Sequence, residues 1–418
     1  MLNKLLQFIG SHQMVSPGDK VICAVSGGAD SIALLWGMYL LKDKLQISLE
    51  AAHFNHGLRG EESIRDEQFV VDFCDRYDIK LYLGRGDVVR GKKGLEAAAR
   101  QARYEFLKQL PGIIVTAHTA DDNAETVLMH MLRGTGLKGL GGITPVGDGV
   151  IRPMLGITRN DVLAFLEEYH LSYVTDSTNE SDDFLRNRMR HHVIPSLIRE
   201  NPQFVRSVSD MAQRLRLDEA ELSAQADAAF TNDIVKIRAM NPAVRNRVLA
   251  KLLAQFGVLE PAAEHVDLLQ NVVFSDNPSA TADFPGNVKI GRVYDRLEII
   301  RETDAFCAEL PIPGVVELEE LNIRIVAAMQ SEREDAYQFI PQGRVFVRSR
   351  QSGDKLTLSG GTKSLKKLFI DRKIPQSARN AMPVICDDGG VVGVWGIGLN
   401  TKRLNNGNDS VCVWIENI

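Results

Sequence analysis

The stretch Val21-Ile22-Cys23-Ala24-Val25-Ser26-Gly27-Gly28-Ala29-Asp30-Ser31 decides the fold. Its first five residues are apolar without interruption, which predicts a strand that is buried on both faces. Residues 32–42 continue as a mostly apolar segment that predicts a helix. A glycine turn between such a strand and such a helix is typical of a parallel α/β sheet.

Strand and helix patterns alternate through the first 180 residues. Further strands are predicted at Ser48–Phe54, Lys80–Leu83 and Ile113–Ala117, and helices at Glu62–Tyr77, Leu95–Leu110 and Asp122–Arg133. Connections between parallel strands are right-handed, so we expect helices on both faces of the sheet. The ligand crevice of such a sheet lies at the carboxyl ends of its strands.

Beyond Pro153 the pattern changes. Helices are predicted at Arg159–His170, Phe184–Leu197, Pro202–Phe230, Asn241–Gly257 and Glu260–Val273. Short strands with Gly and Pro turns follow from Ala280, around one basic helix at Ser364–Arg372. Because 418 residues exceed what one core supports, we predict a parallel α/β domain over 1–200, a mainly helical middle domain over 201–300 and a small mixed α/β C-terminal domain over 301–418.

Basic charge is concentrated in two segments, although the whole chain carries a formal net charge of −5. Residues 341–403 hold 12 Lys and Arg against 4 Asp, and residues 184–216 hold 7 Arg against two acids. Lys and Arg are the residues that bind nucleic-acid phosphates, so the two segments indicate such a partner. No apolar stretch approaches the roughly 20 residues that span a bilayer, and the N-terminus lacks a signal-peptide layout. We therefore expect a cytoplasmic protein with no membrane partner.

The glycine turn has the chemistry of a phosphate-binding loop. Gly27 and Gly28 let backbone N–H groups approach an anion, and the helix N-terminus adds a partial positive charge. Ser26 and Ser31 can donate hydroxyl hydrogen bonds, and Asp30 can hold Mg²⁺. A plain glycine turn with Asp30 and Ser31 as helix caps is the alternative. The loop has neither the Walker A ending nor the dinucleotide Gly-x-Gly-x-x-Gly spacing.

The string Ser26-Gly27-Gly28-Ala29-Asp30-Ser31 after a buried first strand resembles the PP-loop of the ATP pyrophosphatases. The resemblance implies an adenine nucleotide alpha hydrolase-like domain that binds ATP and Mg²⁺ at these six residues, with Asp30 as the metal ligand and a catalytic residue. Enzymes of this family cleave ATP between its α and β phosphates and leave AMP on the substrate.

Further segments resemble the lysidine synthetases within that family. They are His53–Arg59, Gly94–Tyr104, Thr116–Thr126, Arg133–Leu140, Arg152–Leu155, Asp176–Asn179, Arg186–His191, Gly353–Lys355 and Lys363–Phe369. The resemblance implies a ligase that adenylates the wobble cytidine of the isoleucine tRNA with a CAU anticodon. L-lysine then replaces the AMP, so that the products are lysidine, AMP and pyrophosphate.

The resemblance also assigns nucleotide contacts to His53 and Asn55, and it places Arg103, with Arg100, at the α-phosphate or the substrate. Each assignment has a plainer alternative. His53 fits an ordinary loop histidine, and the two arginines, one helical turn apart, fit a solvated helix face. Arg103 is nevertheless predicted as a catalytic residue.

Three carboxylates, Asp121, Asp122 and Glu125, are predicted to bind the lysine, because its ammonium needs an acidic surrounding. The alternative is that they complement the dipole of the helix that begins there. His118, just before them, fits equally well as a residue packed under the sheet.

Five basic residues are predicted to contact tRNA: Arg186, Arg190, Lys363, Lys366 and Lys367. The alternation of Arg186, Arg188 and Arg190 predicts that they point to different sides of a helix and that some are structural. The three lysines return at helical spacing, which predicts one basic helix face.

Three other functions are alternatives to lysidine synthesis. A PP-loop tRNA thiolase that uses paired cysteines would need a C-x-x-C element, and the five cysteines include none. An asparagine-type synthetase would need a cysteine after Met1, where Leu2 stands. The alternative outside catalysis is an ATP-gated RNA-binding protein. The oligomeric state is not predictable, and a homodimer is possible.

Overall fold

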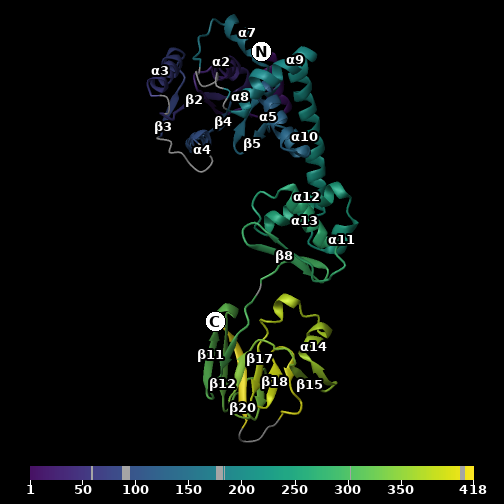
Figure 1. The fold of residues 1–418 in the computed structure, drawn as a ribbon. Coiled ribbons are helices and arrows are strands. Elements are labelled where there is room, and N and C mark those ends of the chain that lie inside the picture. The colour runs from purple at the N-terminus through teal and green to yellow at the C-terminus, as the bar shows by residue number, and fades with distance from the viewer. Residues whose placement is uncertain (58–59, 87–94, 176–181, 183, 302, 405–409) are drawn as a thin grey trace. The chain divides into compact units, whose positions relative to one another are not determined.

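The computed structural model describes residues 1–57, 60–86, 95–175, 182, 184–301, 303–404 and 410–418. These residues group into two compact units, Met1–Glu221 and Leu222–Ile418 (Figure 1). In the parts of the chain so described, no helix is both long and apolar enough to cross a bilayer.

A six-stranded sheet with the order β3-β2-β1-β4-β6-β5 organises the first unit. Its strands are β1 (Lys20–Ala24), β2 (Ser48–Asn55), β3 (Leu81–Arg85), β4 (Ile113–Val115), β5 (Val146–Gly147) and β6 (Val150–Ile151). All neighbours are parallel except β5, which runs antiparallel to β6. The predicted parallel sheet is thus confirmed. The β5–β6 hairpin was not predicted: its strands are only two residues long, and the Asp148-Gly149 turn between them was not recognised.

Helices cover both faces of this sheet, as predicted. Val21 and Cys23 of β1 join one core with α1 (Leu2–Ser11), α2 (Ala29–Leu45), α3 (Glu61–Arg76) and α7 (Arg159–Glu168). Ile22, which points the other way, packs in a second core with α4 (Leu95–Lys108). β1 is therefore buried on both sides, as its unbroken apolar run indicated.

The sheet order reverses at β1, because β2 lies on one side of it and β4 on the other. At such a switch point the loops that leave neighbouring strands diverge and open a crevice. The loop after β1 carries Ser26 to Gly28, and the loop after β4 carries Thr116 to Thr119. The fold thus brings together two segments that lie about 90 positions apart in the sequence.

A group of helices packs beside the sheet through a third core of the first unit. Its members are α5 (Ala120–Leu132), α6 (Leu137–Leu140), α8 (Leu185–Arg188), α9 (Ile194–Glu200) and α10 (Phe204–Ala228). A π-helical turn, Met189–Val193, joins α8 to α9. The helix predicted at 184–197 is therefore three short helical pieces, and Met189 and Ile194 anchor them against α5.

The second unit begins with helices and ends with strands. Its helical part contains α11 (Ile234–Ala239), α12 (Pro242–Gln255), α13 (Ala263–Phe274) and the antiparallel strands β7 (Thr281–Phe284), β8 (Val288–Val293) and β9 (Arg296–Ile299). These elements share one apolar core.

The rest of the second unit is mostly antiparallel sheet. One sheet has the order β10-β14-β17-β18-β19, with β10 (Cys307–Glu309), β14 (Phe346–Arg348), β17 (Val384–Asp387), β18 (Gly390–Val394) and β19 (Gly398–Leu399). Another has the order β11-β12-β20-β13, with β11 (Gly314–Leu318), β12 (Ile323–Ala328), β13 (Tyr337–Phe339) and β20 (Val411–Asn417).

A short helix, α14 (Leu365–Asp371), follows the hairpin of β15 (Lys355–Leu358) and β16 (Gly361–Ser364). Leu365, Leu368 and Phe369 of α14 are buried against this hairpin and β17–β18. The basic helix predicted at 364–372 is confirmed. The domain boundaries at 200 and 300 stay predictions, since the chain divides here into two units.

Candidate active site

The loop after β1 is closed by its own serines. Ser31 Oγ donates to Gly28 O at 2.8 Å and accepts from Ser26 N at 3.2 Å. Gly28 is the N-cap of α2 and provides no side-chain cap. The first N–H groups of the helix are therefore not capped by a side chain and can bind an anion. Ser31, predicted as a phosphate contact or a helix cap, braces the loop.

Gly27 has a positive φ of 90°, a conformation that side chains with a Cβ rarely adopt. Its carbonyl accepts from Val174 N at 2.9 Å, so the chain after α7 is tied to the loop. A Cβ at this position would also touch Val70 and Val174 at 3.5 Å. Glycine is thus required here by the turn itself.

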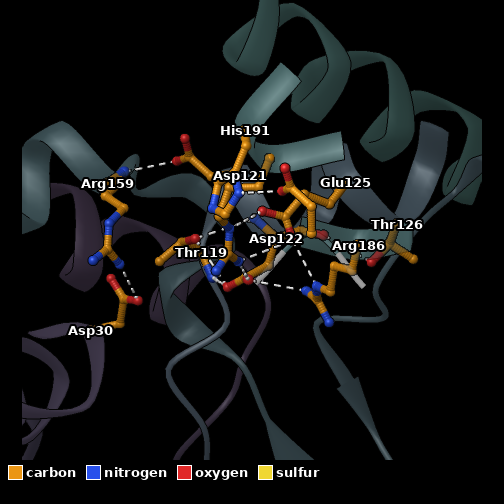
Figure 2. Close-up of polar contacts among 11 residues, drawn as sticks. Asp30, Thr119, Asp121, Asp122, Glu125, Thr126, Arg159, Arg186 and His191 are labelled. Carbon is orange, nitrogen blue, oxygen red and sulfur yellow. Dashed lines mark hydrogen bonds and ion pairs between the residues drawn. The ribbon is translucent and has the colours of Figure 1, made fainter. Parts of the chain in front are cut away.

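Asp30, in the first turn of α2, forms an ion pair with Arg159, Nη1 to Oδ2 at 2.8 Å. The backbone N–H of the same Arg159 donates to Asp121 Oδ2 at 2.8 Å. Figure 2 shows Arg159 between the two carboxylates. Burial raises the pKa of Asp30 to about 6, with Arg159 opposing and the charges of Asp122 and Asp121 adding to the rise. The predicted metal ligand and the predicted lysine-binding acids therefore lie at one site.

The acids of α5 have two different tasks. Asp122 Oδ2 accepts from Thr119 N at 2.9 Å, and Thr119 Oγ1 accepts from Asp122 N, which forms a capping box at the start of the helix. The other oxygen, Oδ1, accepts from Arg186 Nη2 at 3.0 Å and from Arg190 Nη2 at 3.2 Å. One oxygen of Asp122 thus serves the start of α5, where the alternative interpretation has these acids complement the helix dipole, and the other oxygen binds the two arginines.

Glu125 is buried, with a side chain 1% exposed, and two arginines compensate its charge. Arg186 Nε lies 2.6 Å from Oε2 and Arg190 Nε lies 2.6 Å from Oε1 (Figure 2 labels Arg186). Burial opposes the charge of Arg190, but the bond to Glu125 and the nearby acids raise its pKa overall. The three alternating arginines lie on different sides, as predicted: Arg186 and Arg190, four residues apart, share a helix face and contact the same acids. Arg188 instead donates to Asp182 O.

A cavity of about 480 Å³ opens beside this cluster. Its lining is mostly polar and basic: Arg100, His118, Thr126, Ile143, Thr144, Gly147, Asp148, Arg152 and Arg186. Three arginines and one carboxylate, that of Asp148, give the cavity a positive character. Arg186 belongs to both the cavity and the acidic cluster, so the two are adjacent.

His118 lies at the end of the loop after β4. Its Nδ1 shares a hydrogen bond of 2.9 Å with Thr116 Oγ1. Burial lowers the pKa of His118 to about 4, although the charge of Asp122 opposes this shift. The ring is therefore neutral near pH 7. The side chain of His118 also lines the cavity, and the interpretation as a residue packed under the sheet stays a prediction.

The two arginines of α4 differ. Arg100 lines the cavity, and its guanidinium lies 5.1 Å from the ring centre of Tyr104. Arg103 is more enclosed: burial lowers its pKa, and its Nε has no hydrogen-bond partner among the described residues. The catalytic role of Arg103 stays a prediction. Of the two arginines, Arg100 is the one that lines the cavity and could contact a substrate there.

The two residues of β2 that are predicted to contact the nucleotide, His53 and Asn55, form hydrogen bonds within the protein. His53 is buried, and its Nδ1 donates to Val25 O at 2.8 Å, at the end of β1. Asn55 donates to Glu67 Oε2 at 2.9 Å and accepts from Gly57 N at 2.8 Å. Asn55 also lines a second cavity, of about 260 Å³, with Ile64 and Arg85. Both residues shape the region beside the glycine loop, and their nucleotide contacts stay predictions.

The predicted lysine row of the second unit is not one helix face. Lys363 lies on β16, where its Nζ contacts Asp371 Oδ2 at 2.6 Å, and α14 begins only at Leu365. The prediction of one basic helix face is wrong because a helical period was extended into a strand. Lys366 and Lys367 are exposed on α14. Asp354, of the motif 353–355, pairs with Arg348 at 2.8 Å and accepts Gln351 N.

Some motif residues, namely Arg59, Gly94 and residues 176–179, lie outside the described residues. Sequence reasoning assigned no role to Arg152 and did not single out Arg159. Arg152 stands in a segment that had been noted for its resemblance, and this was a usable signal. Arg159 had none, because its partner Asp30 lies 129 positions away.

One carboxylate beside the glycine loop, that of Asp30, is suited to bind a metal ion. Asp30 Oδ1 is buried and has no hydrogen-bond partner within the described ranges. The same ranges contain no cluster of three or more His, Cys, Asp or Glu side chains arranged for a metal. One carboxylate suits Mg²⁺ when substrate phosphates supply further ligands, so the residues fit a nucleotide-bound Mg²⁺ and not an all-protein metal cage.

Three family models match the chain. A PP-loop domain matches residues 1–197, a TilS substrate binding domain matches residues 233–298, and a TilS substrate C-terminal domain matches residues 345–414. The first match contains the glycine loop, α5 and Arg186 and Arg190.

Similar curated proteins match nearly the whole chain. A tRNA(Ile)-lysidine synthase of Geobacillus kaustophilus is 33% identical over 95% of this chain and 95% of its own length. One of Caldanaerobacter subterraneus subsp. tengcongensis is 31% identical over 100% of this chain and 97% of its own. One of Geobacter sulfurreducens is 31% identical over 92% and 90%. The likeness thus extends beyond the PP-loop domain to both units.

Proposed function

The chain belongs to the tRNA(Ile)-lysidine synthase family, and on that premise we propose how its residues carry out the reaction. The enzyme is an ATP-dependent ligase that adenylates the wobble cytidine of the isoleucine tRNA with a CAU anticodon and then joins L-lysine to it. The base oxygen attacks the α-phosphorus and pyrophosphate leaves. The amine of lysine then attacks the activated carbon, AMP leaves, and the amine proton passes to a base.

One observation carries this proposal. Arg159 contacts Asp30 of the glycine loop through its side chain and Asp121 of α5 through its backbone N–H, both at 2.8 Å. The nucleotide loop and the acidic helix are therefore parts of a single site. The two half-reactions need such a site, because the adenylated base must meet lysine before water.

The glycine loop supports binding of the ATP phosphates. Ser26, Gly27, Gly28 and Ala29 surround the start of α2, where N–H groups and the helix dipole favour an anion. Mg²⁺, when bound, would neutralise charge that develops on the leaving pyrophosphate. Asp30 would hold it, because Asp30 Oδ1 is buried and unpaired among the described residues. His53 and Asn55 would flank the nucleotide.

The basic cavity is proposed to receive the target nucleotide. Its volume of about 480 Å³ suits a single nucleotide, and Arg100, Arg152 and Arg186 offer donors for a phosphate group. His118, neutral because burial lowers its pKa to about 4, can donate or accept one hydrogen bond without adding charge. Arg103, behind Arg100 on α4, would support the α-phosphate side.

The cluster of acidic and basic side chains around α5 supports binding of a free amino acid. Lysine carries ammonium groups and a carboxylate, and here Asp121, Asp122 and Glu125 lie with Arg186 and Arg190. Acids would bind the ammonium groups, and an arginine would bind the carboxylate. Asp121 is the candidate base for the attacking amine, since burial raises its pKa above the usual range.

The tRNA partner is expected to contact basic side chains of both units. Lys366 and Lys367 are exposed on α14 within the residues matched by the TilS substrate C-terminal domain. Lys363, Arg186 and Arg190 are engaged in ion pairs, so tRNA contacts by them would compete with their acidic partners. A homodimer and a cytoplasmic location stay predictions.

The alternatives are a PP-loop tRNA thiolase and an ATP-gated RNA-binding protein. Neither is favoured, because the relatives that match over the whole length are lysidine synthases. Pyrophosphate release still separates them: a binding protein releases none when ATP and tRNA are mixed.

The deciding experiment is mass analysis of a CAU-anticodon isoleucine tRNA after incubation with ATP and isotope-labelled lysine. We expect a single added lysine on the anticodon wobble base, and pyrophosphate release that does not require lysine. An unmodified base, or a base that gains sulfur when a sulfur donor is supplied, would show that the proposed reaction is wrong.

A further inference from the structure

The two oxygens of Asp30 have different surroundings. Oδ2 contacts the guanidinium of Arg159 at 2.8 Å. Oδ1 is buried and has no hydrogen-bond partner within the described residues. The Asp30 side chain as a whole is 29% exposed, but a negative charge with one buried, unpaired oxygen is destabilising. A neighbouring cation therefore stabilises this carboxylate when the protein holds no metal.

Arg159 is fixed by its backbone and free at its tip. It is the first residue of α7, and the capping box of Thr158 and Asp161 sets this helix start. Its N–H donates to Asp121, and Asp161 also binds Lys4 at 2.8 Å. The side chain of Arg159 is nevertheless 48% exposed, so it can swing into solvent without unpacking a core.

We propose that Arg159 is a placeholder cation: its guanidinium neutralises Asp30 in the nucleotide-free enzyme and competes there with Mg²⁺. The inference rests on the proposed metal role of Asp30. A divalent ion on either oxygen of Asp30 would lie a few ångströms from the guanidinium, and two cations at that spacing repel each other strongly outside bulk water. Metal binding therefore requires the arginine to withdraw.

This arrangement has two consequences. The free enzyme avoids an uncompensated buried charge, and it binds Mg²⁺ weakly until a nucleotide supplies more oxygen ligands. Arg159 thus couples metal entry to ATP binding. It is a positioning residue, since it acts on Asp30 and not on the reacting atoms.

The test measures thermal unfolding of the full chain, without nucleotide, over a MgCl₂ series at constant ionic strength. A ligand that binds only the folded state raises its Tm with the logarithm of the ligand concentration relative to Kd. Over one fixed rise in Tm, we expect the Mg²⁺ concentration at the midpoint of that rise to be at least threefold lower in Arg159→Gln than in wild type. The variant keeps the backbone bond to Asp121, so it retains the start of α7.

Three variants make the result specific. Arg76→Gln, an exposed arginine of α3, should behave as wild type. Arg159→Lys restores a cation and should return the midpoint towards wild type, which a purely structural role would not predict. Asp30→Asn combined with Arg159→Gln should lose the added stabilisation.

Equal midpoints in wild type and Arg159→Gln would overturn the placeholder role. Failure of the wider proposal looks different: if Asp30→Asn still releases pyrophosphate from ATP and tRNA, Asp30 is not the metal ligand. If Asp30→Asn abolishes that release while Arg159→Gln leaves the Mg²⁺ midpoint unchanged, only the placeholder role is wrong.

Discussion

Arg190 donates to both carboxylate oxygens of Glu125, through Nε to Oε1 at 2.6 Å and through Nη2 to Oε2 at 3.1 Å. Glu125 is so deeply buried that this bidentate pair, together with Arg186, is what allows its charge in the fold. The residues proposed to bind substrate therefore also hold α8 and the π-helical turn against α5.

Removing one arginine should destabilise the first unit. Arg190→Met leaves Glu125 with one partner, and we expect the free energy of unfolding to fall by about 1–3 kcal/mol. Urea denaturation followed by circular dichroism measures this change. The matched control is Arg188→Met two residues away, whose bond is to the exposed Asp182 carbonyl. Equal loss in both variants would contradict the structural importance of the Glu125 pair.

Neutralising Glu125 should affect the second half-reaction more than the first. Glu125→Gln keeps the size of the side chain, removes the charge that attracts an ammonium and replaces one of two acceptor oxygens by a donor NH₂ group. We expect the KM for lysine to rise about tenfold, about 1.4 kcal/mol, while pyrophosphate release with ATP and tRNA stays within about twofold. Glu105→Gln, on the exposed side of α4, is the control and should change neither. An unchanged KM for lysine would remove Glu125 from the amino-acid site.

His118 should make stability depend on pH. Burial lowers its pKa from 6.5 to about 4. Between these values the unfolded chain binds more protons than the folded one, so stability falls as pH falls from about 6.5 to 4. His118→Gln lacks this titration, so relative to wild type it should gain on the order of 1–2 kcal/mol between pH 7.5 and pH 5. Denaturation at both pH values measures the difference, and a constant difference would contradict the buried neutral ring.

The lysines on and just before α14 should contribute more to tRNA affinity when they are not already held in an ion pair within the protein. Lys366→Gln with Lys367→Gln should weaken binding and reduce the slope of log K against log salt by about 0.7–0.9 per lost phosphate contact. Lys363→Gln should change the slope less, because Lys363 is already paired with Asp371. Filter binding at four salt concentrations tests this, and an unaltered slope in the double variant would exclude α14 from the RNA surface.

Local patterns predicted the part of the fold that depends on local physics. The apolar run of β1, the glycine turn and the helix after it are set by neighbouring residues, and all three are present. The β5–β6 hairpin had a local signal that was missed, the two-residue turn Asp148-Gly149, in which both residues have positive φ. The π-helical turn could not be predicted, because it depends on packing against α5. Lys363 was misplaced because a helical period was carried across a strand end.

The site was predictable as a set of motifs but not as a set of contacts. The roles of Asp30, Asp121 and Glu125 were inferred from the resemblance of their segments to PP-loop and lysidine synthetase motifs, together with the need of an ammonium for acidic neighbours. Which cation faces each acid was not, because Arg159 and Asp30 are 129 positions apart and Arg190 and Glu125 are 65 apart. That Arg186 and Arg190 lie on the same helix face could have been predicted, since four residues make nearly one helical turn.

Asp122 shows how little room this site leaves for redesign. One of its oxygens completes the start of α5 and the other faces two guanidinium groups. An engineer who wished the enzyme to accept a shorter diamine or a neutral amino acid would have to keep an oxygen acceptor at 122 or lose the helix start along with the specificity. Residue 125 offers no safer position, because the buried carboxylate of Glu125 pairs with Arg186 and Arg190 and so holds α8 and the π-helical turn against α5.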